Sequence, residues 1–215
     1  DLFNFKLCIN RLYDSCIASG RQFSLIASII ICASIIIGVL SMTGLGVKLT
    51  SLIISLSGNS VWPALILTGL ACLLLGMEVP TTAAYVICVS VAGPALVDMG
   101  LELLQVHLFV FWFALLSTIT PPVCGTVFIA SGMVSENWLK VSITSMSLGI
   151  GLYFIPLAMI ANDEIIKLDT EFLYAIMAFV KIALSLVMLS YALITKSLIF
   201  LRLLAFGLGM VLMFV

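Results

Sequence analysis

Long apolar runs separated by short polar segments make up most of this chain. The runs with at most one charged side chain are residues 23–47, 62–97, 105–133, 141–161, 172–195 and 197–215. An α-helix rises 1.5 Å per residue, so about 20 apolar residues cross the ~30 Å hydrocarbon layer of a membrane. The pattern therefore predicts an all-α integral membrane protein. Residues 1–22 are mixed in character and are expected to form a separate interfacial or connecting helix.

The run 62–97 is too long for one ordinary span and has a polar interruption at residues 76–82. Division there leaves two arms of about 14 to 17 residues, each short for a full crossing. A re-entrant helical hairpin, which enters and leaves the membrane on one side, fits these lengths.

The run 105–133 is interrupted by Thr120, Pro121 and Pro122. Two adjacent prolines remove two amide donors and disfavour helical geometry at the residue before them. This run therefore predicts a discontinuous helix, made of two half-helices joined by an unwound segment.

The distribution of basic residues supports the hairpin. If the run 62–97 crosses an even number of times, six of the nine Lys and Arg residues share one side: Lys6, Arg11, Arg21, Lys140, Lys196 and Arg202. The acidic segment 162–171 then lies on the opposite side. The positive-inside rule makes the basic side cytoplasmic, so the hairpin is expected to open from the outside.

The composition agrees with a membrane protein and excludes several other classes. The chain is 63% hydrophobic and 9% charged, whereas soluble domains carry roughly 25% charged residues. The net charge of −1 gives no reason to expect a nucleic-acid partner. Because the chain starts at Asp1 and stops at Val215 within an apolar run, we expect it to be part of a longer chain.

The motifs of enzymes are absent from the sequence. The single histidine belongs to no HExxH motif, and the sequence has no GxSxG motif, no P-loop and no paired carboxylates within an apolar run. The six cysteines lie mostly in apolar runs without CxxC spacing, so we interpret them as small helix residues. The sequence thus predicts neither an enzyme nor an organic cofactor.

The polar groups at the two interruptions suit a small cation. Sodium prefers hard oxygen ligands, which unwound backbone carbonyls and hydroxyl side chains supply without a buried charge. The predicted sodium ligands are Gly76, Thr81, Thr82, Ser117, Thr118, Thr120 and Gly125, with the hydroxyl of Thr126 nearby. Half-helix N-termini at such breaks also direct partial positive charge at an anionic solute. One such break alone would be an ordinary kink, but two hydroxyl-rich breaks favour a binding site.

Glu78 is the only ionised side chain in the run 62–97. Burial of a carboxylate at bilayer depth costs free energy, so Glu78 is a functional candidate. The alternative is that the hairpin tip reaches a water-filled cavity, in which Glu78 is merely solvated. Two other functions remain open at this point. One is a proton-coupled carrier or channel in which Glu78 titrates, and the other is a structural membrane subunit that transports nothing.

Three blocks of sequence carry a family resemblance: LGMEVPTTAAY at residues 75–85, AGPAL at residues 92–96 and TITPPV at residues 118–123. They resemble the fused permease of tripartite ATP-independent periplasmic (TRAP) transporters, in its C-terminal repeat. The resemblance implies half of an inverted-repeat ion-transporter fold. It also implies an elevator mechanism for sodium-coupled uptake of organic acids, delivered by a periplasmic binding protein across the bacterial inner membrane.

The resemblance also implies a substrate site. Residues 76–82 would be the tip of the outer hairpin and residues 117–125 the unwound part of the paired helix. The substrate-binding residues would be Glu78, Pro80, Thr81, Thr82, Thr120, Pro121 and Pro122, although Glu78 replaces a small uncharged residue of the family. The other partners implied are the lipid bilayer and the N-terminal repeat of the same permease.

Overall fold

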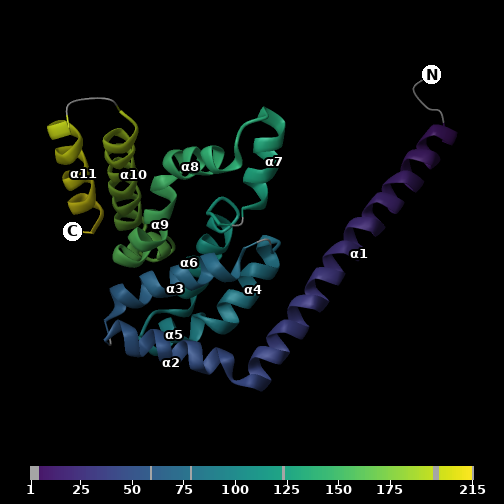
Figure 1. The fold of residues 1–215 in the computed structure, drawn as a ribbon, viewed down its shortest axis with the longest axis horizontal. Coiled ribbons are helices and arrows are strands. Elements are labelled where there is room, and N and C mark those ends of the chain that lie inside the picture. The colour runs from purple at the N-terminus through teal and green to yellow at the C-terminus, as the bar shows by residue number, and fades with distance from the viewer. Residues whose placement is uncertain (1–4, 59, 78, 123, 196–198, 215) are drawn as a thin grey trace.

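The computed structural model describes residues 5–58, 60–77, 79–122, 124–195 and 199–214. Within these ranges every regular element is a helix (Figure 1). In chain order the elements are α1 (Phe5–Thr43), α2 (Leu45–Ser57), α3 (Val61–Leu75), α4 (Thr81–Val91), α5 (Gly93–Asp98), α6 (Leu103–Leu116), α7 (Gly125–Val134), α8 (Trp138–Leu148), α9 (Ile150–Ala161), the 3-10 helix η1 (Asp163–Ile166), α10 (Phe172–Ile194) and α11 (Ile199–Phe214). The all-α prediction is therefore confirmed for the described part of the chain.

The first helix is longer than the sequence predicted. We expected an interfacial helix over residues 1–22 and a span over residues 23–47, but α1 runs without a break from Phe5 to Thr43. It has no proline, and a glycine inside a helix weakens it without ending it. The helix ends where Gly44 adopts a left-handed conformation with φ 67°, which a residue with a side chain would adopt only at a cost.

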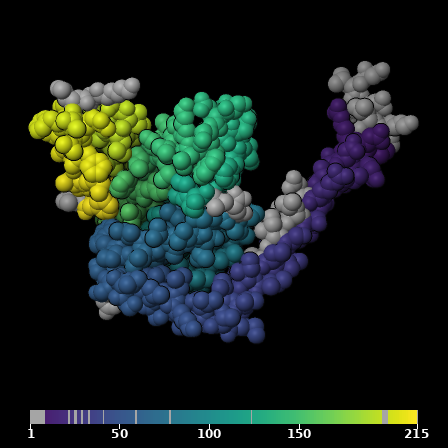
Figure 2. Space-filling view, in the orientation of Figure 1, coloured from purple at the N-terminus to yellow at the C-terminus, as the bar shows by residue number. Residues whose placement is uncertain are grey.

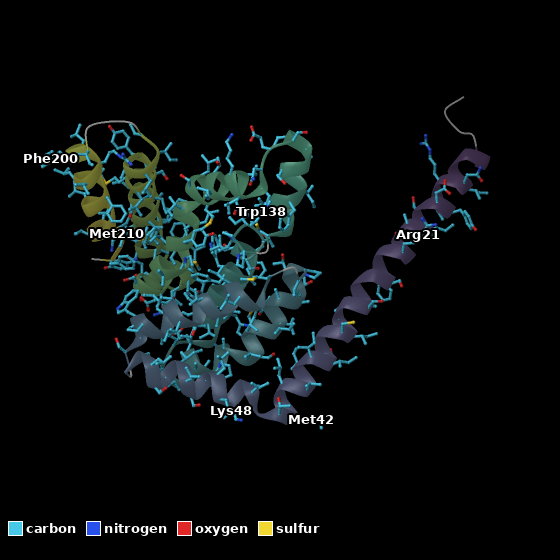
Figure 3. All side chains as sticks on the ribbon, in the orientation of Figure 1. Arg21, Met42, Lys48, Trp138, Phe200 and Met210 are labelled. Atoms are coloured by element: carbon cyan, nitrogen blue, oxygen red, sulfur yellow. The ribbon has the colours of Figure 1, made fainter. Side chains whose placement is uncertain are left out.

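Helix α1 stands apart from the rest of the molecule over most of its length (Figures 1 and 2). Its C-terminal part contacts α2 and α4. At the bend between α1 and α2, the side chains of Met42 and Lys48 are exposed on the outside (Figure 3). The main body is formed by the other helices.

In the described ranges, α10 is the one helix that is long and apolar enough to cross a membrane by itself. Two bent pairs of helices would each make one more span. Ile30–Leu40 of α1 and α2 meet at 69°, and α8 and α9 meet at 42°. The second bend lies at Gly149, between α8 and α9, whereas Pro156 lies inside α9.

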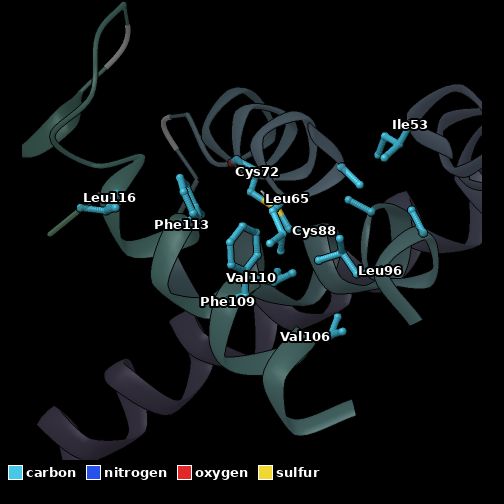
Figure 4. Packing of buried hydrophobic residues seen from close by; sticks show 13 residues of the cluster. Ile53, Leu65, Cys72, Cys88, Leu96, Val106, Phe109, Val110, Phe113 and Leu116 are labelled. Atoms are coloured by element: carbon cyan, nitrogen blue, oxygen red, sulfur yellow. Dashed lines mark hydrogen bonds between the residues drawn. The ribbon is translucent and has the colours of Figure 1, made fainter. Parts of the chain in front are cut away.

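The largest hydrophobic core lies between α2, α3, α4, α5 and α6 (Figure 4). Leu65, Leu96, Phe109 and Val110 are fully buried in it. Gly69 lets α3 approach α6, because a Cβ atom there would lie 2.8 Å from Cζ of Phe113. This core fixes the positions of α3 and α6, the helices that lead into the two breaks.

A second core joins α9 to the hairpin of α10 and α11. The buried Asn162 amide donates to the carbonyls of Ala158 and Met213, both at 2.9 Å. The Lys181 ammonium donates to Asn162 Oδ1 at 2.7 Å. The Lys181 side chain thus reaches from the α10 span to the start of the acidic segment.

The acidic segment also holds an exposed ion pair. Lys167 Nζ lies 2.6 Å from a carboxylate oxygen of Asp163. The hydrogen bond to this carboxylate and its charge raise the pKa of Lys167.

Candidate functional site

The first break separates α3 from α4 and reverses the direction of the chain. Gly76 is the C-cap of α3, and its N–H donates to the Cys72 carbonyl at 2.9 Å. Pro80 is the N-cap of α4, and its carbonyl accepts from Ala84 N–H. Cys88 of α4 lies beside the Cys72 carbonyl at 3.7 Å, so the two helices run back along each other as arms of a hairpin.

The second arm of this hairpin is shorter than predicted. The sequence placed its end at Val97, but α4 ends at Val91 and a separate short helix, α5, follows. Pro94 lies in the first turn of α5, where the missing N–H of proline has no partner to lose. Pro94 is therefore accommodated at the start of α5.

The second break separates α6 from α7. The last turn of α6 tightens, since Thr118 and Ile119 N–H donate to the carbonyls of Leu115 and Leu116 at 3.3 and 3.2 Å. The peptide bond between Pro121 and Pro122 is cis. The Thr126 hydroxyl closes the loop by donating to the Thr118 carbonyl at 2.6 Å.

This unwound loop leaves peptide oxygens available. Among the described residues, no N–H or O–H donates to the carbonyls of Ile119, Thr120 and Pro121. Pro121 and Pro122 contribute to this lack of donors, because neither residue has a backbone N–H. The discontinuous helix predicted for residues 105–133 is thus present, with its break at the predicted residues.

The two breaks are in direct contact. The Ser117 hydroxyl, which is 0% exposed, lies 3.1 Å from the Gly76 carbonyl and 2.7 Å from that of Ala114. A Cβ atom on Gly76 would lie 2.8 Å from Cβ of Ser117, so only glycine permits this approach. The end of α6, marked by Phe113 and Leu116, lies beside the turn from α3 to α4 in Figure 4. Gly76 and Ser117 thus bring the two breaks into contact.

In the described part of the chain, the other predicted site residues form no hydrogen bond from one break to the other. Thr81 and Thr82 are the first two residues of α4, and Gly125 is the first residue of α7. Among the described residues the hydroxyls of Thr81 and Thr82 have no hydrogen-bond partner. Thr118 and Thr120 donate within their own turn, to Leu115 and Leu116. Glu78 lies outside the described residues.

The contact joins neutral oxygen atoms at the C-terminal ends of α3 and α6, because Gly76 and Ser117 are the C-caps of these helices. In the described residues the oxygens at the breaks belong to hydroxyl groups and peptide carbonyls. Helices α4 and α7 have 11 and 10 residues, and both start at the breaks. Their first N–H groups carry partial positive charge. Such a site can hold a small hard cation and, beside it, an anionic group.

Tyr153 of α9 is a residue of this region that the sequence did not reveal. Its hydroxyl lies 2.6 Å from the Thr120 hydroxyl. A signal for this contact exists in the sequence: Pro156 lacks the N–H that would bond the Leu152 carbonyl four residues earlier. That carbonyl accepts from the Trp112 indole at 2.9 Å, which attaches α9 to α6 beside the break.

Together, the apolar helices and the two interrupted helices in contact define a helical membrane protein, because lipid tolerates broken backbone only inside protein or a polar cavity. The chain matches the family described as "Tripartite ATP-independent periplasmic transporter, DctM component" over residues 2–169, and it belongs to this family. Both breaks and Tyr153 lie within the match, whereas α10 and α11 lie beyond it. No protein of curated function and no solved structure matches the chain.

Membership of this family sets the general role of the chain. It is a permease component of a TRAP transporter, a class of inner-membrane transporters and not of enzymes. The family works with a periplasmic binding protein and a small-molecule substrate.

Proposed function

We propose that this chain carries a sodium site and one wall of the substrate site of a TRAP permease, and that it takes up organic acids with sodium. The observation that carries the proposal is the contact of the Ser117 hydroxyl with the Gly76 carbonyl, which joins two broken helices. A carrier needs a site at which an ion and a solute bind beside each other. The contact between the breaks offers groups for both.

The cation would bind to oxygens from both breaks. The carbonyls of Ile119, Thr120 and Pro121 accept no hydrogen bond from the described residues. Hydroxyls of Thr81, Thr82, Thr118 and Thr120 lie at the same two breaks. These are the hard, neutral ligands that suit a monovalent cation. Because Gly76 and Ser117 already touch, a bound sodium ion would stabilise the contact without a large rearrangement.

The organic acid would bind at the N-termini of α4 and α7. Pro80, Thr81 and Thr82 start α4, while Thr120, Pro121 and Pro122 lie in the loop before α7. Partial positive charge at two helix N-termini favours a carboxylate and adds no buried lysine or arginine. Glu78 would then help set which charge state of the substrate is accepted.

The rest of the proposal comes from the family. We propose that the periplasmic binding protein delivers the acid, that this chain pairs with an N-terminal repeat in the lipid bilayer, and that the site moves by an elevator mechanism. The chain would cross the inner membrane several times. In this arrangement α3 and α4 form the outer re-entrant hairpin.

A counterflow assay tests the proposal. The intact permease in proteoliposomes should exchange radiolabelled mono- or dicarboxylates only with sodium present, at any fixed proton gradient. Thr120→Ala removes one proposed ligand oxygen and should lower exchange about tenfold, as the loss of one hydrogen bond or ligand costs about 1–1.5 kcal/mol. Pro121→Ala should also lower exchange strongly.

Thr144→Ala is the matched control, because the Thr144 hydroxyl makes the same kind of bond to the carbonyl four residues earlier, on exposed α8. It should leave exchange unchanged. Exchange that ignores sodium and disappears in Glu78→Gln would establish the proton-coupled alternative. Normal exchange in Thr120→Ala and Pro121→Ala would overturn the proposed site.

A further inference from the structure

We infer that Tyr153 is a positioning residue of the cation site, which donates its hydroxyl proton to Thr120 and thereby weakens the binding of a cation to the Thr120 oxygen. The inference rests on the proposed function for the identity of the cation. Tyr153 lies in α9, outside both breaks and outside every residue assigned to the site above.

The direction of the hydrogen bond follows from the partners of Thr120. Thr120 Oγ1 lies 2.7 Å from the Leu116 carbonyl and 2.6 Å from the Tyr153 hydroxyl. A carbonyl can only accept, so the single proton of Thr120 goes to Leu116. Tyr153 must therefore be the donor in its bond with Thr120.

This assignment leaves Thr120 with little capacity for a further partner. A hydroxyl oxygen has two lone pairs, and the proton of Tyr153 takes one of them. A cation that approaches Thr120 Oγ1 meets that proton, which carries partial positive charge. The Tyr153 hydroxyl thus competes with the cation for the same oxygen.

Tyr153 is held firmly enough to have this effect. Its ring packs against the main core together with Trp112, Ile119 and Leu157. The residue before it, Leu152, accepts the Trp112 indole N–H at its carbonyl. This bond exists because Pro156 leaves the carbonyl without a helical donor. The packed ring and the Trp112–Leu152 bond therefore fix where the Tyr153 hydroxyl lies.

The Thr120 side chain does not depend on Tyr153 for its own orientation. Its bond to the Leu116 carbonyl persists without the phenol hydroxyl. Removal of that hydroxyl should therefore free one lone pair and keep the oxygen in place. The expected consequence is tighter cation binding, with slower release and slower turnover.

The test is direct binding of ²²Na⁺ to the purified, intact permease, with KCl used to hold the ionic strength constant. Tyr153→Phe keeps the packed ring and should lower the dissociation constant for sodium about three- to tenfold, the range expected for one neutral hydrogen bond. Counterflow turnover should fall in the same variant. Tyr174→Phe, an exposed position on α10, is the control and should change neither quantity.

Thr120→Val removes the shared oxygen and completes a double-mutant cycle. In that background Tyr153→Phe should have no further effect on sodium binding. A merely structural role of Tyr153 would weaken binding or lower stability, and would not tighten binding.

The inference is overturned if Tyr153→Phe leaves the sodium dissociation constant unchanged or raises it, while the wild-type permease binds sodium. If the wild type binds no sodium above the potassium background, the proposed function fails as well. The two failures are therefore distinguishable.

Discussion

At the scale of single residues, Gly76 and Ser117 determine whether the two breaks can meet. The contact requires a glycine, because the nearest atoms of Ser117 leave no room for a Cβ. It also requires a small hydroxyl residue in a fully buried position. Interiors are packed densely, so one added methyl group at such a contact forces its neighbours to move.

We predict that Gly76→Ala separates the breaks. The new methyl group would lie 2.8 Å from Cβ of Ser117, and such overpacking lowers the free energy of unfolding by about 1–3 kcal/mol. Thermal unfolding of the permease in detergent measures this loss, and counterflow measures the accompanying loss of exchange.

Gly38→Ala is the control for this substitution. A Cβ at Gly38, on exposed α1, meets nothing within 4 Å. Alanine should be neutral there or stabilising by up to about 1 kcal/mol, because it is the better helix former. Equal unfolding temperatures and exchange rates of the two variants would show that the Gly76–Ser117 contact does not contribute to stability or transport.

At the scale of helices, Asn162 connects three elements with one side chain. It bonds to Ala158 in α9, to Met213 in α11 and to Lys181 in α10, and uses both amide protons and its oxygen. Helices α10 and α11 lie beyond the residues that match the family. This polar connection therefore attaches them to the helices that carry the site.

We predict that Asn162→Ala loosens the α10–α11 hairpin. The substitution leaves the Met213 carbonyl and the Lys181 ammonium without their partner, which should lower the free energy of unfolding by about 2–4 kcal/mol, whereas the Ala158 carbonyl keeps the backbone N–H of residue 162. Lys181→Met in the same protein should restore part of the loss, since no unpaired ammonium then remains.

Lys140→Met serves as the surface control. Lys140 forms an exposed ion pair with Glu136 at 3.1 Å, and such pairs contribute about 0–1 kcal/mol. Thermal unfolding of the three variants checks the prediction. An additive effect of Asn162→Ala and Lys181→Met would contradict the proposed coupling.

The helices also show how far the sequence predicts this fold. The two breaks were predicted at the correct residues, because proline and glycine act on their own backbone and on the residue just before. The length of α1 was not predicted. The change from mixed to apolar composition at residue 22 decides whether water or lipid surrounds the helix, but it does not interrupt the backbone hydrogen bonds.

Contacts between distant residues account for the rest. Pro156 would leave an orphan carbonyl, but Trp112, 40 residues before its acceptor Leu152, supplies the missing donor. The Tyr153–Thr120 bond spans 33 residues in the sequence. A pattern of hydrophobic positions gives no information on which distant residues form such pairs. The residues of the breaks could therefore be identified from the sequence, whereas the residues that contact the breaks could not.

At the scale of the whole molecule, the two hydrophobic cores hold the helices that surround the proposed site. The main core holds α3 and α6, and the second core holds α9. A ligand bound at the two breaks would contact residues that belong to both hairpin and discontinuous helix. Its binding energy would therefore stabilise the whole bundle against unfolding.

We predict that sodium removal destabilises the intact permease. A ligand at ten times its dissociation constant stabilises the native state by about 1.4 kcal/mol. Exchange of NaCl for KCl at constant ionic strength should therefore lower the melting temperature. Ser117→Ala should reduce this difference, whereas Thr144→Ala should not. Equal melting temperatures of the wild type in both salts, at any concentration, would argue against a sodium site.

The single glycine at which α1 ends has a mechanical consequence. Helix α1 has 39 residues, so at 1.5 Å per residue it is about 58 Å long. With the joint at Gly44, each degree of rotation sweeps the far end of this lever through about 1 Å of arc. A rotation of about ten degrees at this one position would displace the far end by about the diameter of a helix, and the contacts between α1 and α4 oppose such a rotation.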